Sequence, residues 1–159
     1  MVEVDGFQGF HDLVAGIQGE IENFDSKLEV FLESQVDELQ MDHAEFFSAS
    51  KSPSGNKWAD LAESTIRRKG HSTILVETDK LRQSLTEAGA NFALREFFRE
   101  SDAVALEFGT AVPYAHWHMT GTETMPARPE VGFSRTRVEK IQEELADLLQ
   151  KTVLTKLED

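Results

Sequence analysis

The residue types best suited to chemistry gather in one run, TAVPYAHWHMTGTETMPARPEVGFS, at residues 110–134. Its two histidines, His116 and His118, lie two positions apart, a spacing that invites a metal-site interpretation. Pro113 pre-sets a helical turn through residues 114–119, and residues two apart on a helix point about 200° apart around its axis. The imidazoles are then expected to face opposite sides. On a strand they would share a face, but a third ligand would still be needed, and no HExxH spacing supplies one.

Other catalytic groupings have little support. The absence of cysteine excludes disulfides, thiolate metal sites and thiol catalysis. Ser134 lies in no nucleophile-elbow motif. His11, His43 and His71 are isolated, and each is expected at the surface or at a helix end. We therefore expect a protein that is not an enzyme and that needs no metal and no cofactor.

The same run is suited to packing, either inside the protein or against another chain. Tyr114 and Trp117 lie three apart, so a helical turn would place them on one aromatic face beside Met119. Aromatic residues and methionine are frequent both in cores and in interface hot spots, and the sequence leaves these two uses open.

The end of the run, MPARPE, is predicted to be extended. Pro126 and Pro129 fix their own φ angles and disfavour a helix before them. Arg128 lies between them on a stiff backbone, from which its guanidinium could reach a carboxylate. That carboxylate could belong to the acidic helices of the same chain or to a neighbouring subunit, and both interpretations remain open.

Charge is distributed unevenly along the 159 residues, whose net charge is −13. Residues 1–50 hold twelve acidic residues and one basic residue, Lys27. This excess predicts either a solvated helix face or a wall that DNA passes without sticking, and it argues against specific nucleic-acid binding. No apolar run approaches the roughly 20 residues of a membrane span, and no secretory signal is expected at the amino terminus.

Apolar periodicity predicts helices near residues 8–18 and 23–43, separated because Gly16 and Gly19 weaken the pattern. Turn and cap signals then divide the centre of the chain. They predict a turn at 52–55, a helix at 58–70 ended by Gly70 and its basic last turn, an extended piece at 74–76, and a helix capped by Thr78 or Asp79.

Two strands are expected at 91–98 and 103–109, although residues 92–98 would also tolerate a helix. A third strand and a closing helix that begins at Ser134 follow. The fold class is therefore α+β, with a small antiparallel sheet packed against long N-terminal and C-terminal helices. We expect one domain over 1–159, with an acidic helical region at 1–45, a core at 46–134 and a C-terminal helix at 135–159.

Three blocks, at 46–70, 74–85 and 108–134, resemble in order the motifs of the phage virion morphogenesis family, also called tail completion proteins, with relatives in Mu-like phages. The family pattern has a Ser-Pro-x-Gly turn leading to Trp, then Ile-Leu-x-x-Thr-Gly-x-Leu-Arg-x-Ser, and finally Pro-Ala-Arg-Pro-Phe-Leu-Gly. Asp79 stands where glycine is usual, so a left-handed backbone is expected there. Glu130 and Val131 stand where Phe-Leu is usual.

The resemblance implies a non-enzymatic structural protein of the virion neck, assembled in the host cytoplasm, that joins tail to head. It implies a homo-oligomeric ring, usually a hexamer, through which DNA passes, and partners among tail terminator, tail tube and head–tail connector proteins. The expected interface or structural residues are Trp58, Tyr114, His116, Trp117, Pro126, Arg128 and Pro129. The alternatives are a small α+β interaction or regulatory module and, more distantly, a metal-dependent hydrolase.

Overall fold

The computed structural model describes residues 6–99 and 103–154. The expectation for His11 concerns a side chain outside the described ones, and residues 100–102, between the strands, also lie outside. Seven elements follow one another along the chain. They are α1 (Gly6–Ala49), α2 (Glu63–Lys69), α3 (Lys80–Thr86), β1 (Ala93–Arg99), β2 (Val104–Thr110), α4 (Ala115–Thr120) and α5 (Arg135–Leu154).

The amino-terminal region is one helix, and the expected break near Gly16 and Gly19 is wrong. α1 runs unbroken for 44 residues, or about 65 Å at 1.5 Å per residue. A glycine inside a helix costs about 1 kcal/mol relative to alanine, which weakens the helix without ending it. Good helix formers on both sides carry the backbone hydrogen bonds through.

The strands form a two-stranded antiparallel sheet in which Leu94 pairs with Gly109 and Phe97 with Leu106. This confirms the hairpin and the α+β class. The expected third strand is wrong for the described residues, because the chain after α4 makes only an isolated bridge between Thr122 and Met125. Prolines further along cannot donate to a strand ladder, which explains why pairing stops there.

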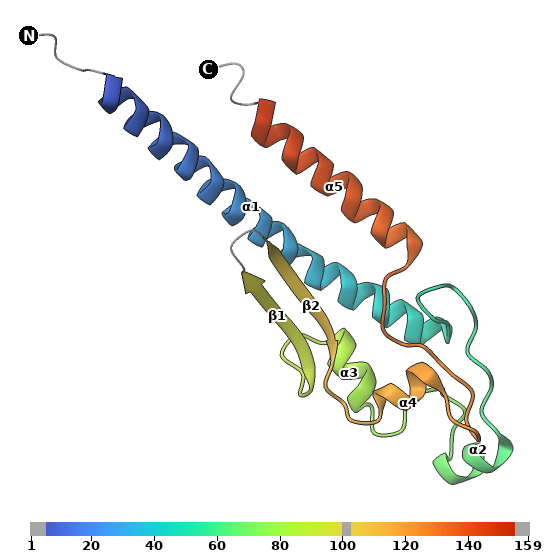
Figure 1. Ribbon diagram of the computed structural model, residues 1–159. Coiled ribbons are helices and arrows are strands. Elements are labelled where there is room, and N and C mark those ends of the chain that lie inside the picture. The colour runs from blue at the N-terminus through green and yellow to red at the C-terminus, as the bar shows by residue number, and fades with distance from the viewer. Residues whose placement is uncertain (1–5, 100–102, 155–159) are drawn as a thin grey trace, which may run out of the picture.

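Figure 1 shows the layers around α1. The hairpin and α3 lie on one side of α1, α5 runs beside it, and α2 and α4 gather near its carboxyl-terminal end. Polar contacts join α5 to α1: Arg137 Nε donates to Asp42 Oδ2 at 2.7 Å, and Lys140 Nζ lies 3.1 Å from Glu38 Oε2. Arg137 Nη1 also lies 2.8 Å from Glu38 Oε2. Hydrogen bonds with Lys140, the largest cause, and with Arg137, the next, lower the pKa of Glu38.

Local signals set several boundaries correctly. The turn at 52–55 is closed by Gly55 N–H donating to Ser52 O at 2.8 Å, and Gly70 ends α2 with φ 77°. Ser134 Oγ accepts the N–H of Arg137, as expected of a residue that caps α5. Asp79 has the expected left-handed backbone, with φ 62°.

Other local predictions are wrong. Asp79 does not cap α3 with its side chain, because its carboxylate pairs with Arg82 instead. The expected helix at 58–70 begins only at Glu63, and the expected extended piece at 74–76 contains a turn in which Leu75 has φ 58°. In both places contacts with residues distant in the sequence decide the conformation of the backbone.

The core lies where α1 ends against α3 and the loops around α4. Its buried side chains come from five separate stretches of chain, so no single element could bury them alone. They are Phe47, Trp58, Ile74, Leu81, Leu85, Val112 and Ala115.

His43 is buried on α1, which corrects the expectation of a surface or helix-end residue. Its Nδ1 lies 2.6 Å from Leu39 O, and its ring centroid lies 5.0 Å from that of Phe108. The sequence did indicate this burial, since His43 extends the apolar helical stripe that includes Leu39 by one further turn. Burial lowers the pKa of His43, because the charged imidazole would lose its hydration.

Acid should therefore destabilise the protein through His43. With the folded pKa below the ordinary value, proton uptake favours the unfolded state, and stability is lost as pH falls below about 6.5. The free energy of unfolding of the wild type, compared with that of His43→Leu, should fall by about 1.4 kcal/mol for each unit by which folding lowers the pKa of His43. Urea denaturation at several pH values measures this difference. His71→Leu, on a turn after α2, is the control. A His43→Leu profile parallel to the wild type would contradict the assignment.

Candidate functional site

Helix α4 begins the site. The helical turn predicted after Pro113 is confirmed, and the two imidazoles diverge as expected, with His116 exposed and His118 half-buried. Tyr114 packs against the core with its ring edge-on to His118, whereas the side chain of Trp117 is 53% exposed. The expected single aromatic face is thus divided between the core and the surface.

The chain after α4 folds back onto it. Gly121 has φ 74°, and a Cβ atom there would lie 2.8 Å from Ala127 N, so only glycine fits. The returning segment is fixed by Arg128 N–H, which donates to His118 O at 2.6 Å. α4 and residues 121–130 therefore form one packed unit.

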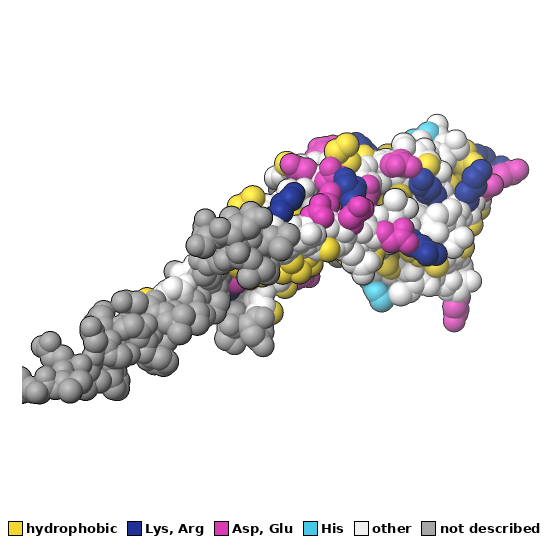
Figure 2. All heavy atoms as spheres, turned by 90° about the horizontal axis from the view of Figure 1, so that it is seen from above, with side chains coloured by type: hydrophobic (Ala, Val, Ile, Leu, Met, Phe, Trp, Pro, Cys, Tyr) yellow, Lys and Arg dark blue, Asp and Glu magenta, His cyan; other side chains and the backbone are white. Residues whose placement is uncertain are grey.

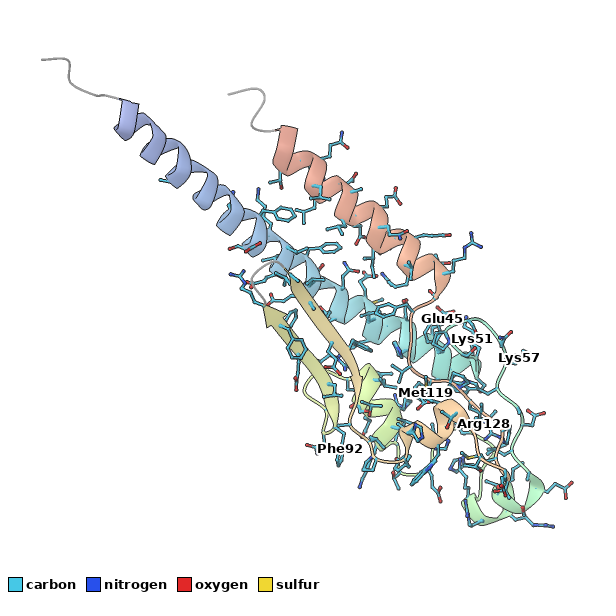
Figure 3. The ribbon with its side chains drawn as sticks, in the orientation of Figure 1. Glu45, Lys51, Lys57, Phe92, Met119 and Arg128 are labelled. Atoms are coloured by element: carbon cyan, nitrogen blue, oxygen red, sulfur yellow. The ribbon has the colours of Figure 1, made fainter. Side chains whose placement is uncertain are left out.

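Arg128 ties this unit to the segment before α2 (Figure 3). Only 4% of Arg128 is exposed; its Nε donates to Ala59 O at 2.8 Å and its Nη2 to Asp60 O at 3.0 Å. In return, Trp58 Nε1 donates to Pro129 O at 2.9 Å. The expected ion pair with the acidic helices of the same chain is wrong, whereas a carboxylate on a neighbouring subunit stays a prediction. Within the chain the guanidinium bonds to backbone carbonyls. They also explain why residues 58–62 stay out of α2, since a helix would use those carbonyls itself.

A cleft of about 730 Å³ opens beside Arg128, and we call it the α2–α4 cleft. Each of the three motif blocks contributes to its wall. Among its lining residues are Leu61, Arg68, Lys69, Tyr114, His118 and Pro126. The basic residues of α2 were predicted only to form the last turn of that helix, so this cleft was missed.

Three Lys or Arg and three Asp or Glu side chains line the cleft, and the pKa values of two of its basic groups are lowered. Burial is the largest cause lowering the pKa of His118, and the nearby charges of Arg128 and Lys69 lower it further. Burial also lowers the pKa of Lys69, whose Nζ donates to Thr73 O at 2.8 Å. A neutral His118 beside cations fits a binding wall better than a proton-transfer group, because no acidic partner contacts it among the described residues.

Glu130 was missed as a buried group. It is fully buried, and neither carboxylate oxygen has a hydrogen-bond partner in the described structure. Burial raises its pKa to about 8, so the carboxyl group is largely protonated at neutral pH. The family pattern indicated this burial, since phenylalanine is usual at the position. Glu130 therefore occupies a place that is apolar in the family pattern, although its own side chain is polar.

The described residues contain no group of three His, Asp or Glu side chains placed to hold a metal ion. Within the same ranges no helix combines the length and apolar character required to cross a membrane. On the face shown in Figure 2, acidic and basic side chains are interspersed, with apolar side chains between them.

The fold and the cleft define a small α+β protein whose distinctive part is a rigid proline-rich loop fixed against the segment before α2. The chain belongs to the phage virion morphogenesis family, whose model matches residues 26–150. It is similar to the Mu-like prophage FluMu G protein 1 of Haemophilus influenzae, with 30% identity over 120 residues that cover 71% of this chain and 76% of that protein. No solved structure matches it significantly.

Membership confirms the family resemblance and assigns the chain to virion morphogenesis. The match begins within α1 and ends within α5, so it takes in more of the chain than the three motif blocks. All seven expected interface or structural residues lie inside it. Of these, Trp58 and Arg128 are buried, Tyr114 and Pro129 are half-buried, and His116, Trp117 and Pro126 are exposed.

Proposed function

We propose that this protein is a non-enzymatic tail completion protein, which assembles into a ring at the head-proximal end of the tail and joins the tail to the head. A hexamer is the expected ring. Its partners would be the tail terminator, the tail tube or the head–tail connector, and DNA would pass through the opening. The net charge of −13 supports this role, because an acidic channel does not hold the duplex.

The observation that carries the proposal is how the shared loop uses its polar groups. The Arg128 guanidinium and the Trp58 indole are both committed to backbone carbonyls across the core. Groups held in this way rigidify a surface and are not free to act on a substrate. A rigid loop in a morphogenesis protein is suited to contact another polypeptide, because it loses little conformational entropy on binding.

The test is genetic and structural. Deleting the coding sequence from its phage or prophage should leave heads and tails that fail to join, seen as separate particles by negative-stain electron microscopy. Supplying the wild-type chain from a plasmid should restore joined virions. An epitope-tagged chain should label the head-proximal end of isolated tails with gold-conjugated antibody. Normal virions from the deletion strain, or label confined to the distal tail end, would refute the proposal.

A further inference from the structure

One face of α1 is exposed although it carries large apolar side chains. Val30 is 66% exposed and Met41 is 68% exposed, the two highest values among the exposed large apolar residues. Between them lie Glu33 and Asp37, both exposed. Positions 30, 33, 37 and 41 follow helical spacing, so they form one stripe about 16 Å long. We call these four residues the outer stripe.

The two acidic side chains of the outer stripe form no ion pair within the described part of the chain. Within the described ranges, neither Glu33 nor Asp37 has an ion-pair partner, although other acids of α1 do pair, such as Glu29 with Arg99 and Asp42 with Arg137. The stripe thus presents two free carboxylates flanked by two exposed apolar side chains. Positions i, i+3, i+7 and i+11 share one face of a helix, so one groove on another chain can contact all four side chains.

The complementary surface is the α2–α4 cleft. Arg68 and Lys69 lie on its wall, and in the described structure no carboxylate forms an ion pair with either. Apolar contact is offered by Leu61, Met125 and Pro126. Asp60, Glu77 and Asp79 also line the cleft, and Asp79 is paired with Arg82, so an incoming carboxylate would be drawn to the side formed by α2.

The two surfaces cannot meet within one chain. No residue of α1 lines the cleft, and Figure 1 shows α2 beyond the carboxyl-terminal end of α1, away from the middle of that helix. Because they are different surfaces on one molecule, they can meet head to tail between copies, and a head-to-tail contact generates a ring when its rotation closes.

From this charge complementarity we propose that the outer stripe of α1 in one copy docks in the α2–α4 cleft of a second copy. The proposal rests on the self-assembly proposed above and names the surfaces that make it. Glu33 and Asp37 approach Arg68 and Lys69, while Val30 and Met41 cover the apolar wall of the cleft. An acidic surface on another tail protein is the competing occupant of the α2–α4 cleft. The experiment below distinguishes it from a second copy of this chain.

Charge reversal on the cleft is the first test. Arg68→Glu should weaken self-association of the purified chain at least tenfold, measured by sedimentation velocity over a concentration series. The matched control is Lys57→Glu, which changes net charge equally; Lys57 is exposed on the loop before α2 and lies outside the cleft (Figure 3). It should associate as the wild type does. Unchanged circular dichroism and melting temperature would show that both variants fold.

Charge reversal on both sides is the decisive test. Glu33→Arg/Asp37→Arg alone should also dissociate, because its basic stripe then faces a basic cleft. An equimolar mixture with Arg68→Glu should assemble again, since every cleft in an alternating ring meets a stripe of opposite charge. Raised salt should weaken the wild-type contact, as expected of exposed ion pairs.

Three results would overturn the inference: a wild type that stays monomeric at all concentrations, equal weakening by Lys57→Glu and Arg68→Glu, or a mixture that remains dissociated. A wild type that stays monomeric alone but binds another tail protein through the cleft would assign the cleft to that partner and also overturn it. In each case head–tail joining could still be restored in the deletion strain, so the proposed function would stand separately.

Discussion

Glu130→Gln should stabilise the protein by roughly 5 kcal/mol at about pH 9, relative to its effect at about pH 4. The reason is the burial of a carboxyl group with no partner for either oxygen, which raises its pKa from 4.5 to about 8. Glutamine has nearly the same shape and cannot ionise, so it removes the cost of burying a charge.

The direction of this stability change follows from the protonation of Glu130 in the folded and unfolded states. Below about pH 4.5 the carboxyl group is protonated in both, and ionisation costs nothing. Between pH 4.5 and about 8 the unfolded chain is ionised while the folded chain holds its proton, so the wild type loses about 1.4 kcal/mol per pH unit. Above about pH 8 both states are ionised and the loss is complete. Domain stabilities are typically 5–15 kcal/mol, so the alkaline wild type should be only marginally stable.

Guanidinium denaturation of the wild type and of Glu130→Gln at several pH values measures this difference. Glu107→Gln is the matched control, because Glu107 lies exposed on β2 and its replacement should leave the profile unchanged. Parallel profiles for the wild type and Glu130→Gln would show that water reaches the carboxylate and that the buried assignment is wrong.

Trp58→Ala should lower the free energy of unfolding by about 3–5 kcal/mol. Trp58 is 5% exposed, packs edge-on to Phe47 with ring centroids 5.5 Å apart, and donates from Nε1 to Pro129 O. Alanine leaves a cavity in the core and also an unpaired carbonyl on the proline-rich loop. Trp58→Phe should cost less, since it fills most of the space and loses mainly the hydrogen bond.

The other tryptophan provides the control. Trp117 is 53% exposed on α4, so Trp117→Ala should cost less than about 1 kcal/mol. Thermal and urea denaturation followed by far-ultraviolet circular dichroism would measure both variants without relying on tryptophan fluorescence. Equal losses for the two variants would place Trp117 in the packed interior, contrary to the structure.

Local predictions succeeded where a few neighbouring residues decide the backbone. Pro113 starts a helical turn because its φ is already helical, and Gly70 ends α2 because it takes a left-handed φ without strain. Ser134 caps α5 with its own hydroxyl. The hairpin was predictable for the same reason, since Leu106 and Phe108 alternate with exposed residues along β2.

Predictions failed where a residue's partner is distant in the chain. Arg128 finds the carbonyls of Ala59 and Asp60, which are 69 and 68 positions away, and no local pattern distinguishes them from a carboxylate. His43 continues a helical stripe, but its burial depends on the approach of Phe108 from the hairpin. The α2–α4 cleft depends on the same long-range closure.

By itself the sequence determined the α+β class, the hairpin, several turns and helix ends, the acidic charge and the family, because each depends on short-range geometry or on residue identity. Only the tertiary structure decided that Glu130 is buried, that Arg128 bonds to carbonyls, and that the three motif blocks share one cleft. Burial and hydrogen-bond pairing are properties of the assembled chain, since they depend on which surfaces exclude water when distant segments meet.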